Sequence, residues 1–158
     1  RVVSPVSFID LTISGVTKRL HRPLSTTEST LLNISSGGSV PIHSGEFNDV
    51  NVNITWAMYD WPTASVSCTN QGKALPVDGV NDVSDAFGLE QYYNQVVSDY
   101  AQFPYSHFRS ALGWPAKYFW TASLHSAGNH YDYYLISGSA SWIGDSTIEA
   151  VSCLSTLP

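Results

Sequence analysis

The two cysteines, Cys68 and Cys153, are the feature that most limits what this chain can fold into. If they are joined, the bond closes a long loop over most of the C-terminal half. Such a cross-link stabilises a fold by roughly 4 to 5 kcal/mol. A disulfide indicates an exported protein, because thiols in the cytosol stay reduced. The alternative is that the two residues are unrelated buried thiols.

The composition favours one substantial domain or two small ones with a neutral, polar and aromatic-rich surface. Of the 158 residues, 43% are hydrophobic, which is enough to bury a core, and 13% are charged. No cofactor is expected. The net charge of -6 argues against nucleic acid as a partner, because binding a phosphate backbone requires clustered Lys and Arg.

Export is expected without membrane insertion of this part of the chain. No apolar run approaches the roughly 18 to 20 residues that cross a bilayer, and the chain does not start with a signal peptide. We therefore interpret Arg1 as an internal cut, with the export signal and any membrane anchor upstream. The expected location is extracellular or on the bacterial cell surface.

Residues 1–56 alternate β-branched and polar side chains and predict short, half-buried strands. These strands are expected at residues 6–13, 31–34, 40–42 and 50–56, separated by Ser-Gly turns. Closely spaced strands without a helix between them favour a sandwich, so this part is predicted to be a short Ig-like β segment.

A basic cluster lies within this segment and contains Lys18, Arg19 and Arg22. It can be read in two ways. Charged side chains protect the open edge of a sheet from pairing with another chain, which predicts an edge strand or a loop. Alternatively, the cluster contacts an acidic partner.

The middle of the chain predicts helices. Apolar residues recur at spacings of three and four over residues 80–103, with Gly88 dividing the pattern into a short and a longer helix and Pro104 ending it. Four acidic residues lie near the expected helix starts: Asp78, Asp82, Asp85 and Glu90. We interpret them as matching the positive helix ends, because no carboxylate loop of the calcium-binding kind is present.

Aromatic-rich strands are expected after the helices, around residues 118–120, 130–136 and 148–153. Strands, then helices, then strands again predict an α+β fold. Three tryptophans of this part are expected to fill the core: Trp114, Trp120 and Trp142.

An ordered series of short motifs runs through residues 56–158. They are Cys-Thr-Asn-Gln-Gly-Lys-Ala-Leu-Pro at 68–76, Leu-Glu-Gln-Tyr-Tyr at 89–93, Gly-Trp-Pro at 113–115, Tyr-Phe-Trp-Thr-Ala-Ser at 118–123, the strand from His130 to Ile136, and Ala-Val-Ser-Cys at 150–153. In this order they resemble the C-terminal region of the invasin/intimin family of bacterial adhesins.

The resemblance implies an Ig-like segment at residues 1–56, short for a complete domain, followed by a C-type-lectin-like domain at residues 57–158. It implies that Cys68 and Cys153 are joined and that the chain binds a protein on a host or neighbouring cell. Calcium is not expected, because the Trp-Asn-Asp strand of calcium-dependent lectins is missing. Residues 142–145 come nearest and lack the amide.

The turn-rich stretch over residues 123–131 is the expected recognition loop. Exposed loops on rigid sheets often contain the residues that bind a partner. Aromatic side chains and histidine offer a large contact area and a polar group at the end of the side chain. The candidate partner-binding residues are His125, Asn129, His130 and Tyr131, together with Lys18, Arg19 and Arg22.

Three functional classes stay open. The first is an adhesin tip that binds a protein receptor. In the second, a secreted protein docks onto an intimin-like outer-membrane protein through its Ig-like part. The third is a hydrolase built from His107, His125 or His130 with Asp132. We do not expect an enzyme, because the chain has neither a Gly-x-Ser-x-Gly motif nor histidines at zinc spacing.

Overall fold

The computed structural model describes residues 4–158, in which three small antiparallel sheets pack with four helices. The strands are β1 (Phe8–Ile13), β2 (Val16–His21), β3 (Gly45–Asp49), β4 (Ile54–Met58), β5 (Tyr118–Ser126), β6 (Asn129–Tyr134), β7 (Ser139–Gly144) and β8 (Leu154–Thr156). The helices are α1 (Thr26–Ser35), α2 (Trp61–Asn70), α3 (Leu89–Asp99) and α4 (His107–Ser110). Arg1, the expected cut site, lies outside the described residues.

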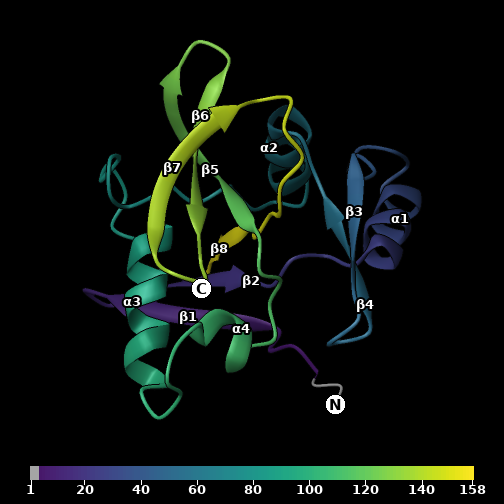
Figure 1. Ribbon diagram of the computed structural model, residues 1–158. Coiled ribbons are helices and arrows are strands. Elements are labelled where there is room, and N and C mark those ends of the chain that lie inside the picture. Colours follow the sequence, from purple (N-terminus) through teal and green to yellow (C-terminus); the bar gives the residue numbers. More distant parts are fainter. Residues whose placement is uncertain (1–3) are drawn as a thin grey trace.

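The two ends of the described chain meet in one sheet. β1 and β2 form a hairpin, and the short C-terminal strand β8 pairs with β2 (Figure 1). The sheet order is β1-β2-β8, so β2 is the central strand. β3 and β4 form a separate hairpin, and β5, β6 and β7 form the third sheet in that order.

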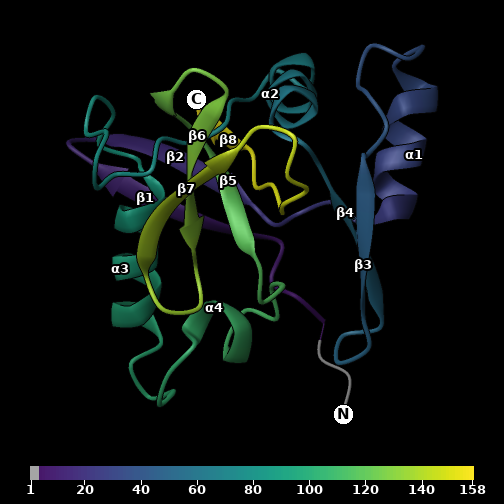
Figure 2. The ribbon, with the colours of Figure 1, turned by 45° about the horizontal axis from the view of Figure 1, so that its top comes forward.

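Helix α1 packs beside β4, as Figure 2 shows. It begins with a capping box. The Ser25 hydroxyl accepts a hydrogen bond from the Glu28 backbone N–H (3.1 Å), and the Glu28 carboxylate accepts one from the Ser25 N–H (2.8 Å). These bonds satisfy two backbone donors that would otherwise lack a partner at the helix start.

Several strands predicted for residues 1–56 are wrong. Residues 31–34 lie inside α1, because the capping box starts a helix that the β-branched pattern does not reveal. Residues 40–42 lie in a loop. Of the strand predicted at residues 50–56, residues 50–53 form the turn between β3 and β4, and residues 54–56 lie in β4. The first hairpin begins two residues later than the strand predicted from residue 6.

The predicted helix over the second half of the 80–103 pattern is confirmed as α3, which begins after Gly88 and ends at Asp99. The shorter helix predicted before Gly88 is wrong. There the Asp78 carboxylate accepts backbone hydrogen bonds from Val80, Asn81 and Asp82, which fixes a loop rather than a helix start.

Helix α2 has no counterpart in the sequence-based prediction. Asp60 caps it by accepting a hydrogen bond from the Thr63 N–H (3.0 Å), and Pro62 lies in its first turn. Both are ordinary signals of a helix start. The helix places Cys68 against the last segment of the chain.

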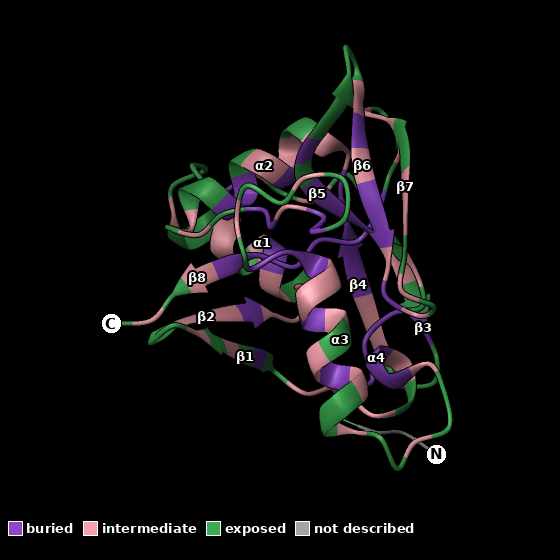
Figure 3. Ribbon diagram, turned by 90° about the vertical axis from the view of Figure 1, so that its left-hand side faces the viewer, coloured by how far each residue is buried: buried purple, intermediate pink, exposed green. Residues whose placement is uncertain are grey.

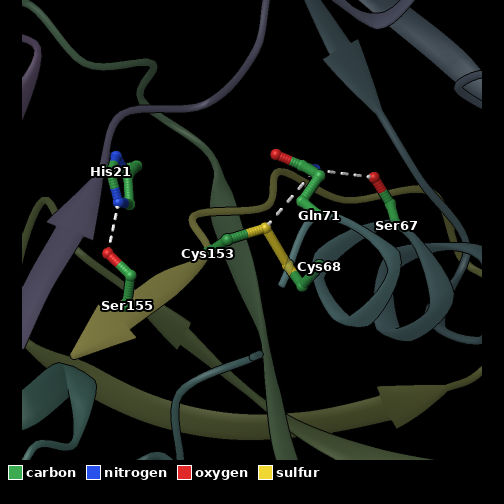
Figure 4. The surroundings of a disulfide bond; sticks show 6 residues. All are labelled: His21, Ser67, Cys68, Gln71, Cys153 and Ser155. Carbon is green, nitrogen blue, oxygen red and sulfur yellow. Dashed lines mark hydrogen bonds between the residues drawn. A yellow bond between two sulfur atoms is a disulfide. The ribbon is translucent and has the colours of Figure 1, made fainter. Parts of the chain in front are cut away.

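The disulfide joins Cys68 of α2 to Cys153, the residue before β8 (Figure 4). Their Cα atoms are 5.4 Å apart. The predicted pairing and the predicted α+β fold are therefore confirmed. Both sulfur-bearing residues are buried, and they pack in a small apolar cluster with Trp120 and Val151.

The main core draws residues from both parts of the chain. Ile9 and Leu20 of the first sheet pack in one cluster with Tyr92 of α3, Trp114 and Phe119. Figure 3 shows the buried middle of the molecule and the exposed rim of the β5–β6 hairpin. Trp114 and Trp120 are fully buried, which confirms the prediction for these two residues.

Residues 1–56 and 57–158 share secondary structure and a buried ion pair. The predicted boundary falls within β4, and β2 pairs with β8 across it. Arg109 of α4 forms two hydrogen bonds, of 2.5 and 2.7 Å, with the buried Asp49 carboxylate at the end of β3. The division into two domains stays a prediction.

Candidate recognition surface

Three aromatic side chains lie together at the surface of the third sheet. The imidazole of His125 (β5) stacks on the indole of Trp142 (β7), with ring centres 4.1 Å apart and planes 11° apart. Tyr131 of β6 meets the His125 ring edge to face, with ring centres 5.2 Å apart. Tyr131 and Trp142 are direct cross-strand neighbours. We call His125, Tyr131 and Trp142 the aromatic triplet.

The packing of α3 explains why this part of the sheet is exposed. Farther along β6, Tyr133 is buried because Tyr93 of α3 meets it edge to face and Glu90 accepts a hydrogen bond from its hydroxyl. Tyr93 also lies over Gly138, where an added Cβ would come within 2.4 Å of the ring. The triplet lies nearer the β5–β6 turn, and Trp142 is 52% exposed.

The loop beside the triplet is ordered by its own hydrogen bonds. Ser126 Oγ contacts His125 Nδ1 at 2.9 Å and accepts from the Asn129 side-chain amide at 3.1 Å. Gly128 occupies the turn with a φ of 78°, a conformation that glycine adopts at no steric cost. Local hydrogen bonds therefore hold His125 in its stacked position before any partner arrives.

The structure thus brings together three of the loop residues predicted from the sequence. His125 is exposed, and Asn129 and Tyr131 are half-buried beside it. Trp142 was missed, because it was expected in the core, and that expectation is wrong. β7 is an edge strand, so one side of it has no neighbour. The sequence of β7 has no charged residue and places serines before Trp142, which is compatible with an exposed strand. It does not show which face of the sheet other elements cover.

His130 points to the other side of β6 and is buried. Trp61 stacks on its ring, with centres 3.5 Å apart, and its Nδ1 lies 2.7 Å from an Asp145 carboxylate oxygen. It therefore supports the recognition loop from beneath. His107 of α4 is also buried, and its Nε2 contacts the Phe103 carbonyl oxygen at 3.0 Å.

The basic residues predicted to bind a partner lie elsewhere, in or beside β2, and each is paired within the protein. Lys18 lies 3.4 Å from Asp85. Arg19 makes two hydrogen bonds to Asp10, which lower the pKa of that carboxyl group. Arg22 makes two hydrogen bonds to the Glu28 carboxylate. Because β2 is the central strand, the interpretation of this cluster as an edge-strand guard is wrong. A role in partner binding stays a prediction.

The buried face of β6 carries a pair of carboxyl groups. Asp132 of β6 and Glu149 are both buried, and the Ser141 hydroxyl donates a hydrogen bond to Asp132. Burial, followed by the neighbouring Asp132, raises the pKa of Glu149 to about 9. At neutral pH the pair therefore holds a proton, which removes the repulsion that two buried carboxylates would suffer.

The described residues do not assemble a hydrolase triad. Three serine–histidine contacts occur, Ser126 with His125, Ser29 with His43 and Ser155 with His21. In none of them does a carboxylate hydrogen-bond the imidazole within residues 4–158, and Ser29 is fully buried. A hydrolase requires a base oriented by a third group and a nucleophile that substrate can reach.

Residues 4–158 contain neither a cluster of metal ligands nor a membrane-spanning helix. No three His, Cys, Asp or Glu side chains are grouped as a metal ion would require. None of the helices in this range has the length and apolar character to cross a bilayer.

Comparison with solved structures identifies the fold. The structure superimposes on the Yersinia pseudotuberculosis adhesin InvE with a TM-score of 0.55 and 23% sequence identity over 92% of this chain. The chain shares its fold with this adhesin. It spans 33% of the length of InvE. The predicted resemblance to invasin-type adhesins is therefore confirmed at the level of the fold.

Sequence comparisons add no further relative. No protein-family model matches the chain, and a search of curated proteins finds no significant match. The structural neighbour is an adhesin and not an enzyme.

Proposed function

We propose that this chain is an exported binding module, the tip of an adhesin, that recognises a protein on another cell through the aromatic triplet and Asn129. Binding requires neither calcium nor catalysis in this proposal. The place of action is outside the cell or on the bacterial surface. The fold shared with InvE supports an adhesin-like module, and the geometry of the third sheet supports the contact residues.

The exposed Trp142, stacked on His125, is the observation that carries the proposal. Tryptophan and tyrosine dominate the energetics of protein interfaces because they bury a large area with little loss of side-chain freedom. An ordered stack at the surface reduces that loss further.

Cell binding by purified variants tests the proposal. Trp142→Ala and His125→Ala should each lower binding about tenfold or more, since central aromatic anchors contribute about 2 kcal/mol or more. Tyr105→Ala is the matched control, because Tyr105 is an exposed aromatic residue outside the triplet. Equal binding by Trp142→Ala and Tyr105→Ala would refute the assignment.

A second candidate follows from the exposed side of α1. Leu31 and Ile34 are exposed there and line an apolar groove of about 470 Å³ with Leu24 and Leu32. This observation favours a secreted protein that docks onto an intimin-like outer-membrane protein through residues 1–56. Leu31→Ser with Ile34→Ser should then abolish docking to that protein and leave cell binding through the triplet unchanged.

A further inference from the structure

A cavity beside the disulfide gathers basic side chains from distant parts of the sequence. Its outer part has a volume of about 280 Å³ and is lined by Ser7, His21, Arg22, Leu24, Glu28 and Lys73. An inner part of about 20 Å³ continues from it. Four lining residues are common to both parts, and the inner part ends at Gln71 and Cys153, which Figure 4 shows beside His21.

The charges that line the cavity sum to about one positive charge at neutral pH. The Arg22 guanidinium makes two hydrogen bonds, of 2.8 and 2.9 Å, to the Glu28 carboxylate, so these two charges offset each other. His21 is uncharged, because burial, together with the nearby Lys73, lowers its pKa to about 4. The remaining charge belongs to Lys73.

The Lys73 ammonium group is half-buried and has no carboxylate partner among the described residues. Its pKa is lowered by burial, which means that the ammonium group has lost part of its hydration. Within residues 4–158, no carboxylate lies within ion-pair distance of it. A half-buried charge of this kind is stabilised by an anion in the same cavity.

The Ser7 hydroxyl in the outer part can donate a hydrogen bond to such an anion. The Gln71 amide lines the inner part, but its Nε2 already donates to Ser67 Oγ at 3.1 Å and to Cys153 Sγ at 3.9 Å. His21 contacts Ser155 Oγ through Nε2 at 2.7 Å, which fixes its ring at the cavity wall. Leu24 supplies an apolar wall.

We propose that this cavity binds one carboxylate group, held by Lys73 with hydrogen bonds from neighbouring donors. One net positive charge fits a singly charged ligand better than a doubly charged phosphate monoester or a sulfated polymer. A volume of about 280 Å³ lies at the lower end of the range for small-molecule pockets, so the ligand is small. A chain-terminal carboxylate of a peptide and a single acidic sugar both meet this description.

This site goes beyond the recognition surface proposed above and is independent of it. The cavity lies at β2 and the disulfide, whereas the aromatic triplet lies toward the far end of the β5–β6 hairpin (Figure 1). Loss of either site in an experiment therefore leaves the other assignment unchanged.

Titration followed by NMR tests the proposal on the disulfide-bonded chain. The probes are N-acetylglycine for a peptide end, glucuronate for an acidic sugar and acetate for a bare anion, each against sodium chloride at equal ionic strength. N-acetylglycine, glucuronate or both should give chemical shift changes that saturate at Lys73, Gln71 and Ser7. The probe whose shift changes saturate identifies the kind of carboxylate that the cavity binds. Shifts that grow linearly for all three probes would overturn the proposal.

Variants of Lys73 provide the second measurement. Lys73→Met should weaken binding of the saturating probe about tenfold or more, since it removes a charge-assisted hydrogen bond to the carboxylate. Lys73→Arg should retain most of it. Lys117→Met is the matched control, because Lys117 lies over the Phe47 ring outside the cavity. Equal affinity in Lys73→Met and Lys117→Met would overturn the assignment.

A readout on the unmodified protein remains if Lys73→Met fails to fold. The pKa of Lys73, followed at its Cε resonance, should rise when the probe is bound, because a nearby carboxylate favours the charged ammonium. The probe is fully ionised in this pH range. An unchanged Lys73 pKa at a saturating probe concentration would contradict the proposal.

Discussion

The first and third sheets use the same kinds of side chain in opposite ways. On β2, the Arg19 guanidinium lies 3.5 Å from the centre of the Phe8 ring and also binds Asp10. There, aromatic and charged groups of the same protein contact one another at the surface. On β7, Trp142 faces solvent with His125 stacked on it, and the sequence of the strand contains no charge. The proposed recognition surface therefore rests on an exposed aromatic side chain that has a stacking partner and no charged partner.

The disulfide fixes the C-terminal segment that connects the two sheets, and breaking it should have the largest effect. Reduction of Cys68–Cys153 releases a loop that spans more than half of the chain. We expect the free energy of unfolding to fall by roughly 4 to 5 kcal/mol. Thermal unfolding with and without reductant measures this. A Cys68→Ser, Cys153→Ser double variant should not respond to reductant; a response there would indicate another cause.

Tryptophan substitutions on the two sides of the third sheet should separate structure from recognition. Trp120 is fully buried, and its indole N–H donates to the Tyr59 carbonyl at 2.7 Å. Trp120→Ala should therefore cost about 3 to 5 kcal/mol in denaturant unfolding. Trp142→Ala removes only the surface stack and should cost about 1 kcal/mol. Similar losses for both would mean that Trp142 is structural.

The buried carboxyl pair behind the recognition surface should make stability depend on pH. The pKa of Glu149 is raised to about 9 in the folded state, above its ordinary value of 4.5. The folded state therefore binds the extra proton between these values, and stability should fall as pH rises through this window. The slope for one proton is at most about 1.4 kcal/mol per pH unit.

Glu149→Gln is the matched variant for this titration. It keeps the shape of the side chain and cannot ionise, so its unfolding free energy should vary less between pH 5 and pH 9 than that of the unmodified protein. Urea unfolding at several pH values measures the difference. Parallel pH profiles for the two proteins would show that Glu149 is not the titrating group.

Charge removal on β2 should have the smallest effect. The Arg19–Asp10 pair is partly exposed, and pairs of this kind contribute about 0.2 to 1 kcal/mol. Arg19→Gln should lower stability by that amount, less at high salt, and should leave cell binding unchanged. A loss of cell binding as large as that of Trp142→Ala would show that the basic cluster takes part in recognition.

The local signals that failed did so for identifiable reasons. The capping box at Ser25 and Glu28, and the Asp60 cap with Pro62, both mark helices, but β-branched residues and a missing apolar period concealed α1 and α2. The strand pattern at residues 31–34 was therefore mistaken for β structure. In contrast, the amphipathic spacing after Gly88 predicted α3 well, because one side of that helix is buried.

By itself, the sequence predicted helix α3, strands β5 and β6 and a turn-rich loop containing His125, Asn129 and Tyr131, since these follow from residue chemistry and local periodicity. The family resemblance implied the cross-link. The strand predicted at residues 148–153 is wrong, because only isolated bridges form there, and β7 was not predicted. The tertiary structure alone decided that Trp142 is exposed while Trp120 is buried as predicted, that β8 pairs with β2, and that Lys73 faces a cavity with His21. The physical reason is that burial and charge pairing depend on which distant segments pack against a residue. Local periodicity carries no information about those partners.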